Sequence, residues 1–135
     1  MGCGRVGSAL SFRLLELGHS VAIIDKEENA FQILGDDFTG QKVLGIGFDR
    51  DTLIEAGIEK AQAFAAVSSG DNSNIVSARV ARETFNVPLV VARIYDPRRA
   101  KVYERLGIPT VASVAWTTDQ VLRRLLPLGA QEEWR

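Results

Sequence analysis

Short runs of β-branched and aliphatic residues alternate along this chain with helical patterns of about ten residues. The runs are apolar throughout rather than at every second position, which is typical of parallel strands that are covered on both faces. We expect strands at SVAIID (20–25), QKVLG (41–45), AFAAVSS (63–69), PLVVARI (88–94) and TVAS (110–113). This alternation predicts an α/β fold built from βαβ units.

Helices are predicted between these strands, near residues 5–17, 28–34, 50–56, 73–85, 98–106 and 115–126. Asp49 and Ser73 are the expected N-caps of two of them, and Asp96 followed by Pro97 predicts the start of a third. Four glycines are placed to end helices in the left-handed conformation, namely Gly18, Gly35, Gly57 and Gly107.

A glycine-rich turn, Gly2-Cys3-Gly4-Arg5-Val6-Gly7, stands directly before the first predicted helix. Its G-x-G-x-x-G spacing permits a tight turn, close approach of a pyrophosphate to the backbone, and close packing of the helix on the sheet. The free amides and the positive dipole end of such a helix attract phosphate. A plain glycine-rich turn is the alternative interpretation.

Asp25 ends the strand 20–25 and lies 18 residues after Gly7. A carboxylate about 20 residues after the glycines of a dinucleotide-binding fold accepts hydrogen bonds from ribose hydroxyls. It also repels a 2′-phosphate, which favours adenosine or NAD over NADP. Together with the glycine turn, Asp25 predicts a Rossmann-like, doubly wound parallel sheet that binds an adenine nucleotide. A helix N-cap is the alternative role for Asp25.

Other polar residues follow the predicted strands at the edge where open α/β sheets bind ligands. We include in the candidate cofactor site Lys26 after Asp25, Ser69, Asp71 and Asn74 after the strand 63–69, and Arg93 in the strand 88–94. The alternatives are that Asp71 and Asn74 cap the helix 73–85, and that Arg93 forms a surface or interface ion pair.

No strand precedes the glycine turn, although the first strand is central in the Rossmann order 3-2-1-4-5-6. Without it the sheet would separate into halves, each with an unpaired edge. We therefore expect Met1 to be the last residue of a strand whose earlier residues are missing from this numbering, or another chain to supply that strand.

Residues suited to catalysis are poorly placed in this sequence. An oxidoreductase needs a proton donor beside the nicotinamide, but His19 lies in a turn away from the ligand edge, and neither Tyr95 nor Tyr103 is followed four residues later by lysine. Cys3 lies in the phosphate loop, where the helix dipole would lower its pKa, unless it is simply a small residue tolerated there. We expect a sensing module rather than an enzyme, with an NAD-dependent oxidoreductase fragment as the alternative.

Charge and hydropathy exclude further classes. The net charge of −1 gives no basic face for nucleic acid, and the apolar runs are too short for direct insertion into a membrane. One cysteine and the absence of a secretory leader favour the cytoplasm.

The chain has the length of one domain, which we place at residues 1–127, followed by a tail at 128–135. The last helix is expected to stop at Pro127 and to pack on another chain or domain through an apolar face formed by Trp116, Val121, Leu122, Leu125 and Leu126.

Two long segments closely resemble the TrkA-N domain, also called RCK (regulator of conductance of K⁺) or KTN: GCGRVGSALSFRLLELGHSVAIIDKEENAF and LIEAGIEKAQAFAAVSSGDNSNIVSARVARETFNVPLVVARIYDPRRAKVYERLGI. The arginine inside G-x-G-R-x-G, the L-x-x-A-G-I turn, the Asp and Asn after the strand 63–69, and the A-R-x-x-D-P to L-G-I unit occur together and in order. The resemblance covers almost the whole chain.

The resemblance implies a cytoplasmic regulatory subunit at the inner face of the cell membrane, bound to a potassium channel or to the membrane subunit of a Trk/Ktr-type potassium transporter. Such domains form homodimers or rings and bind NAD(H) or ATP/ADP, which changes the shape of the ring. Carried over by position, the resemblance assigns the phosphates to Gly2, Gly4, Arg5, Val6 and Gly7, the ribose to Asp25, and the far side of the cleft to Asp71 and Asn74.

Two departures from the family pattern are visible. After the strand that corresponds to 41–45, the family usually has Gly-Asp-Ala, whose acid can meet the adenine edge, whereas this chain has Ile46 at that place. Adenine recognition is then expected to rest on backbone groups. The second, C-terminal domain of the family is also absent from this sequence, which implies a naturally short form or a fragment.

Overall fold

The computed structural model describes residues 1–126. All of its strands are short and parallel. In chain order they are β1 (Ala22–Asp25), β2 (Gln41–Leu44), β3 (Ala63–Ala66), β4 (Leu89–Arg93) and β5 (Thr110–Val111). The predicted α/β class and the order of the elements are confirmed. The strands are shorter than predicted, above all the one expected at 63–69, which ends at Ala66.

The helices alternate with these strands as expected. The α-helices are α1 (Arg5–Glu16), α2 (Arg50–Glu55), α3 (Asp71–Arg79), α4 (Pro97–Arg105) and α5 (Ser113–Leu125). The segment predicted at 28–34 is a 3₁₀ helix, η1 (Glu28–Leu34), and a 3₁₀ turn, η2 (Ile58–Lys60), follows α2. A π-helical turn, η3 (Val80–Thr84), continues α3.

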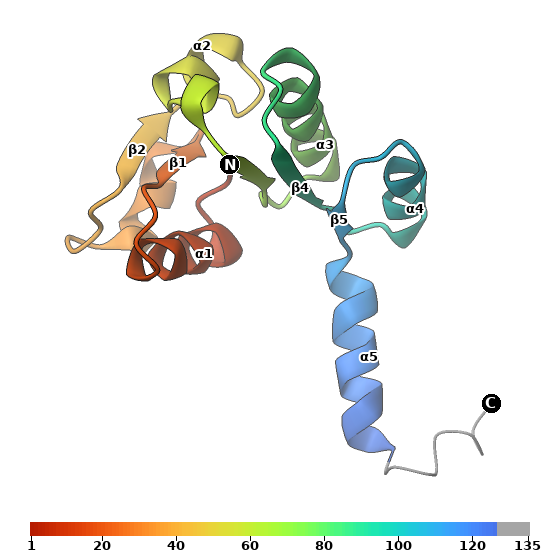
Figure 1. The fold of residues 1–135 in the computed structure, drawn as a ribbon. Helices are drawn as coiled ribbons and strands as arrows, with labels where there is room; N and C mark the ends of the chain where they lie inside the picture. The colour runs from red at the N-terminus through yellow and green to blue at the C-terminus, as the bar shows by residue number, and fades with distance from the viewer. Residues whose placement is uncertain (127–135) are drawn as a thin grey trace.

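The parallel strands form two separate sheets, β1-β2 and β3-β4-β5. The N-terminus lies between them (Figure 1). The ammonium group of Met1 donates to the Ala65 carbonyl at 2.7 Å, and the Val67 amide donates to the Met1 carbonyl at 2.8 Å. On the other side, the Gly2 amide donates to the Ile24 carbonyl at 2.8 Å. The division of the sheet at the position of the absent first strand is therefore as predicted, and Met1 and Gly2 bridge the two halves at one end.

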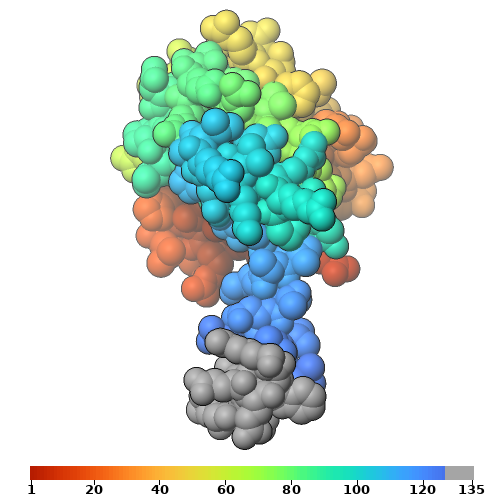
Figure 2. All heavy atoms as spheres, turned by 90° about the vertical axis from the view of Figure 1, so that its right-hand side faces the viewer, coloured from red at the N-terminus to blue at the C-terminus, as the bar shows by residue number. Residues whose placement is uncertain are grey.

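The main core lies between the strands and the helices that cover them. Its largest fully buried apolar side chains are Leu53, Ile94 and Val43. A smaller cluster, formed by Cys3, Ile23 and Leu34, packs under α1 and η1. The helix α5 contributes no buried residue, and it projects from the body of the domain (Figures 1 and 2).

Most predicted helix ends are confirmed. Asp49 accepts a hydrogen bond from the Thr52 amide at 3.1 Å, and Asp96 accepts one from the Arg98 amide at 2.9 Å. The four glycines predicted to end helices all have positive φ. The predicted N-cap at Ser73 is wrong, because α3 begins at Asp71 after an extended Gly70. The predicted stop at Pro127 and the tail lie outside the described residues.

Candidate functional site

The three glycines of the turn at residues 2–7 meet different surroundings. Gly2 has φ of +102°, and a Cβ there would lie 2.6 Å from the Ser68 backbone nitrogen. A Cβ at Gly7 would overlap the carbonyl oxygen of Gly2. A Cβ at Gly4 would have no heavy atom within 4 Å. Gly2 and Gly7 are thus required by the fold, whereas Gly4 borders open space.

The start of α1 leaves amide groups available for an anion. The first hydrogen bond of the helix runs from the Ser8 amide to the Gly4 carbonyl at 2.9 Å, so the amides of Arg5, Val6 and Gly7 precede it. The first turn of α1 contains no acidic residue. Gly4 and the side chains of Arg5 and Val6 are exposed. The positive end of the helix dipole is therefore open at this edge of the sheet.

Asp25 lies beside this turn at the end of β1. Its Oδ2 accepts a hydrogen bond from the Cys3 amide at 2.8 Å, and its Oδ1 accepts one from the Glu27 amide at 2.9 Å. Each carboxylate oxygen can accept more than one hydrogen bond, and the side chain is partly exposed. Asp25 therefore holds the glycine turn against β1 and keeps acceptor capacity on the same edge.

Asn74 is buried, with 1% of its surface exposed. Its Oδ1 accepts hydrogen bonds from the Ser68 amide at 2.9 Å and the Ser68 hydroxyl at 2.6 Å. Its Nδ2 donates to the carbonyls of Ser68 at 2.9 Å and Arg93 at 2.7 Å. Asn74 thus joins the ends of β3 and β4 instead of capping a helix. The sequence analysis did not identify Ser68 as the partner of Asn74, because neither its residue type nor its spacing indicates this contact.

Asp71 makes a second connection of this kind. Its two carboxylate oxygens accept hydrogen bonds from the backbone amides of Tyr95 at 2.7 Å and Asp96 at 3.0 Å. These amides belong to the loop between β4 and α4, so Asp71 fixes that loop rather than its own helix.

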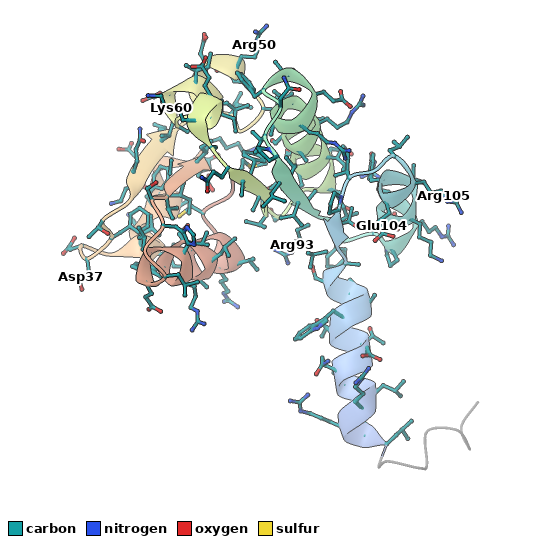
Figure 3. The ribbon with its side chains drawn as sticks, viewed as in Figure 1. Asp37, Arg50, Lys60, Arg93, Glu104 and Arg105 are labelled. Carbon is teal, nitrogen blue, oxygen red and sulfur yellow. The ribbon has the colours of Figure 1, made fainter. Side chains whose placement is uncertain are left out.

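The remaining candidates lie at the same edge without converging on one point. The Arg93 Nε donates to the Ser113 hydroxyl at 3.0 Å, and Figure 3 shows Arg93 at the end of β4, close to the start of α5. The described residues give Arg93 this hydrogen bond and no ion pair. Lys26 and Ser69 are exposed on loops after β1 and β3.

Burial decides the ionisation of two groups near the turn. Burial raises the pKa of the Cys3 thiol, and the nearby Asp25 carboxylate acts in the same direction. The lowered pKa considered for Cys3 from the helix dipole is therefore wrong. Burial also lowers the pKa of the Met1 amino group to about 6. His19 is exposed, at the opposite end of α1 from the glycine turn.

The loop after β2 presents two apolar side chains that sequence reasoning did not use together. Ile46 is 48% exposed and Phe48 is 41% exposed. Together with Asp49 and Arg50 they line a shallow hollow of about 410 Å³. Gly45 connects this loop to the site, because its amide donates to the Asp25 carbonyl at 2.9 Å.

The structural description contains no group of three potential metal ligands within residues 1–126. In the same range, no helix has the length and apolar character needed to cross a bilayer.

Comparison with known proteins gives consistent results. The model of the TrkA-N domain matches residues 1–114. The chain is 69% identical over 135 residues to the Trk system potassium uptake protein TrkA of Streptomyces coelicolor, covering all of this chain and 60% of that protein. It is 32% identical over 126 residues to a TrkA homolog of Methanothermobacter thermautotrophicus, covering 93% of this chain and 58% of that protein. The chain thus spans less than two thirds of the length of these relatives.

Solved structures share the fold. The TrkA-N domain of the inner membrane protein ybaL from Escherichia coli has a TM-score of 0.77 at 21% identity, covering 92% of each chain. The Kef C-terminal domain from Shewanella denitrificans, solved in an AMP-bound form, has a TM-score of 0.76 at 23% identity and covers 94% of this chain and 80% of that one. The NAD(P)-binding domain of an exopolyphosphatase-related protein from Archaeoglobus fulgidus has a TM-score of 0.75 at 19% identity, covering 92% of each chain.

Proposed function

This chain belongs to the TrkA-N domain family, and we propose on that basis that it is a regulatory, non-enzymatic module that senses an adenine nucleotide and controls potassium transport. The observation that carries the proposal is the open N-terminus of α1 beside the Asp25 carboxylate at the carboxyl edge of the strands. Relatives named as Trk potassium uptake proteins support the link to potassium.

The phosphates of the nucleotide would bind the amides of Arg5, Val6 and Gly7. Gly4 supports this position because it presents no side chain to the space in front of the helix. The exposed guanidinium of Arg5 suits phosphate because its planar fork pairs two oxygens. The ribose hydroxyls would donate to Asp25, which disfavours a 2′-phosphate.

The adenine ring would lie toward the loop after β2. The exposed Ile46 and Phe48 offer apolar contact there, and backbone groups would supply polar recognition in place of the acid usual in the family. The phosphates, the ribose and the adenine ring are common to ATP, ADP, NAD⁺ and NADH, so the proposal covers NAD(H) and ATP/ADP.

Nucleotide binding at the glycine turn would change how the two half-sheets are placed relative to each other. The glycine turn touches both half-sheets, through the Cys3 amide on Asp25 and through Gly2 against Ser68. A ligand held by the turn therefore shifts any equilibrium between two placements of the halves, by the difference of its affinity for them. Such a shift would be passed on through a homodimer or ring to a potassium channel or Trk/Ktr-type subunit at the inner face of the membrane.

Calorimetric titration of the purified chain with AMP, ADP, ATP, NAD⁺ and NADH tests this function. The sharpest variant is Gly4→Ala, since its methyl group meets no protein atom within 4 Å but occupies the phosphate position. We expect it to weaken binding at least about tenfold, equivalent to about 1.4 kcal/mol, without lowering the melting temperature. Arg13→Ala, at the far end of the same helix, is the control and should bind normally.

Absence of binding by every nucleotide at millimolar concentration would refute the proposal, as would unchanged affinity in Gly4→Ala. Hydride transfer to or from NAD by the purified chain with a small-molecule substrate would support the oxidoreductase alternative instead.

A further inference from the structure

The loop between β2 and α2 carries the shallow hollow toward which the proposed function directs the base of a nucleotide. This loop is joined to the glycine turn at two places. The Gly45 amide donates to the Asp25 carbonyl at 2.9 Å, and Gly47 is buried so closely against Met1 that a Cβ there would overlap the Met1 side chain. The hollow is therefore fixed beside the turn, and the groups that line it decide which bases it accepts.

Two of the four side chains that line the hollow, Ile46 and Phe48, are apolar and exposed. An aromatic ring and an aliphatic chain attract the flat face of a base by stacking and dispersion. Such contact tolerates different bases, because every base has a π-face. An apolar pocket also discriminates weakly between ligands of the same size that differ in one polar group. The apolar part of the hollow thus holds a base without identifying it.

The two polar side chains of the hollow are Asp49 and Arg50. The Asp49 Oδ2 accepts from the Thr52 amide at 3.1 Å and from the Thr52 hydroxyl at 3.0 Å, which holds the carboxylate against the first turn of α2. Arg50 begins α2 and is exposed at the outer surface of the domain (Figure 3), and its guanidinium only donates. These side chains therefore provide no acceptor dedicated to the amino group of adenine.

The backbone of the loop offers donors. The Ile46 carbonyl accepts from the Asp49 amide at 3.0 Å. Within residues 1–126, the amides of Gly47 and Phe48 make no hydrogen bond. An amide donates, and the ring nitrogens N3 and N7 that would accept are the same in adenine, guanine and hypoxanthine. Backbone recognition at this loop therefore suits a purine but does not depend on the group at its C6.

We propose that the site accepts purine ribonucleotides whatever group stands at C6 of the base, so that GDP and IDP bind as ADP does. Ile46 determines this tolerance, because it places an aliphatic side chain where an acceptor would select the adenine amino group. The inference rests on the proposed function, since it takes the phosphates to bind the glycine turn and the ribose to bind Asp25.

Calorimetric titration of the purified chain with ADP, GDP, IDP and CDP at one salt concentration tests the ligand class. We expect the dissociation constants of the three purine nucleotides to agree within about threefold. CDP should bind at least about fivefold more weakly than ADP, because its smaller ring stacks less and has no N7.

Three variants test the residues of the hollow. Ile46→Asp supplies an acceptor, so it should bind ADP at least about tenfold more tightly than GDP. Phe48→Ser should weaken ADP and GDP alike by about fivefold or more, and Phe48→Tyr, which keeps the ring, should bind both like the parent. Ile54→Ser is the matched control, because Ile54 is 43% exposed on α2 and does not line the hollow. Melting temperatures identify any variant that fails to fold.

The outcomes separate this inference from the proposed function. Binding of ADP at least about tenfold more tightly than GDP by the parent chain would overturn the inference and leave the proposed function standing. Equal binding of CDP and ADP would overturn the purine class, and unchanged affinity in Phe48→Ser would remove the base from the hollow. An Ile46→Asp chain that folds without gaining preference for ADP would overturn the role of Ile46. Absence of binding by every nucleotide would instead refute the proposed function itself.

Discussion

At the scale of single residues, the glycine turn divides into positions that the fold requires and a position that faces the candidate ligand. Gly7 lies directly against the carbonyl of Gly2, and Gly2 lies against Ser68, so neither has room for a side chain. A side chain at Gly4 would meet no neighbouring atom, and the extended backbone there is a conformation that any residue can adopt. The same sequence motif thus serves packing at two glycines and, in our proposal, binding at the third.

We therefore predict that Gly7→Ala lowers the free energy of unfolding by about 1–3 kcal/mol, since the new methyl group overlaps the Gly2 carbonyl and forces the turn to move. Urea unfolding measures the change. Gly4→Ala is the matched control and should unfold like the parent chain. Equal stability of Gly7→Ala and the parent would contradict the packing described here.

The Met1 amino group gives a pH-dependent prediction for the chain that begins at this residue. Its pKa falls from 8.0 to about 6 on folding, because burial outweighs the attraction of Asp25 and Cys3. Between these pH values the unfolded chain holds a proton that the folded chain lacks, so stability rises with pH. We expect a gain of about 2 kcal/mol from pH 6 to pH 8, which is lost as the pH falls back to 6.

Urea unfolding at several pH values measures this slope, with His19→Gln as the background to remove the one histidine. Acetylation of the Met1 amino group should abolish the slope because an amide does not titrate. A slope of opposite sign, or one that survives acetylation, would contradict the assignment.

At the scale of elements, α3 is the connection between the central strands of the second half-sheet. Asn74 joins the ends of β3 and β4, and Asp71 holds the loop that leads into α4. Both side chains are directed at backbone groups, so they determine the shape of the carboxyl edge on which the candidate site lies. Their contribution to ligand binding would then be mainly through this shape.

We predict that Asn74→Ala lowers the free energy of unfolding by about 3 kcal/mol, because it leaves buried groups of Ser68 and Arg93 without their partner. Ser77 is the matched control on the same helix. Its hydroxyl is buried without a hydrogen-bond partner. We therefore expect the free energy of unfolding of Ser77→Ala to lie within about 1 kcal/mol of the parent value or above it. Thermal and urea unfolding compare the two, and equal effects would contradict this account.

At the scale of the whole molecule, the domain consists of two half-sheets joined at one end by Met1 and Gly2, with α5 projecting from the body (Figures 1 and 2). Trp116 is 65% exposed and Leu125 is 70% exposed on this helix. We proposed above that the chain assembles into a homodimer or ring, and the exposed apolar side chains of α5 would provide the surface for contact with a second copy.

We accordingly predict that the purified chain is larger than a monomer in light scattering, and that Trp116→Ser combined with Leu125→Ser shifts it toward the monomer. Neither side chain is buried within the domain, so the monomeric variant should have the same melting temperature as the parent domain. Thr118→Ala, an exposed change on the same helix, is the control. A monomeric parent chain, or an assembly unaffected by the double substitution, would contradict assembly through α5.

Features governed by local rules could be predicted from the sequence. The order of strands and helices follows from hydrophobic period, and the helix ends at Asp49, Asp96 and the four glycines follow from backbone preferences of single residues. The separated sheet was predictable too, because a central strand has no substitute in this topology. The start of α3 was not predictable in this way: it lies at Asp71 and not after Ser73, and the side chains of Asp71 and Asn74 are directed by contacts across the fold.

What the tertiary structure decided was the set of partners for each polar or ionisable group. Asn74 meets Arg93, 19 residues away, and Asp71 meets the Tyr95 amide, 24 residues away. Cys3 is buried against Ile23 and Leu34, which reverses the direction of pKa shift considered from its place near a helix start. Sequence determines where elements begin and end because these preferences act over a few residues. Hydrogen-bond partners and burial depend on which distant segments come together, and this is determined by packing.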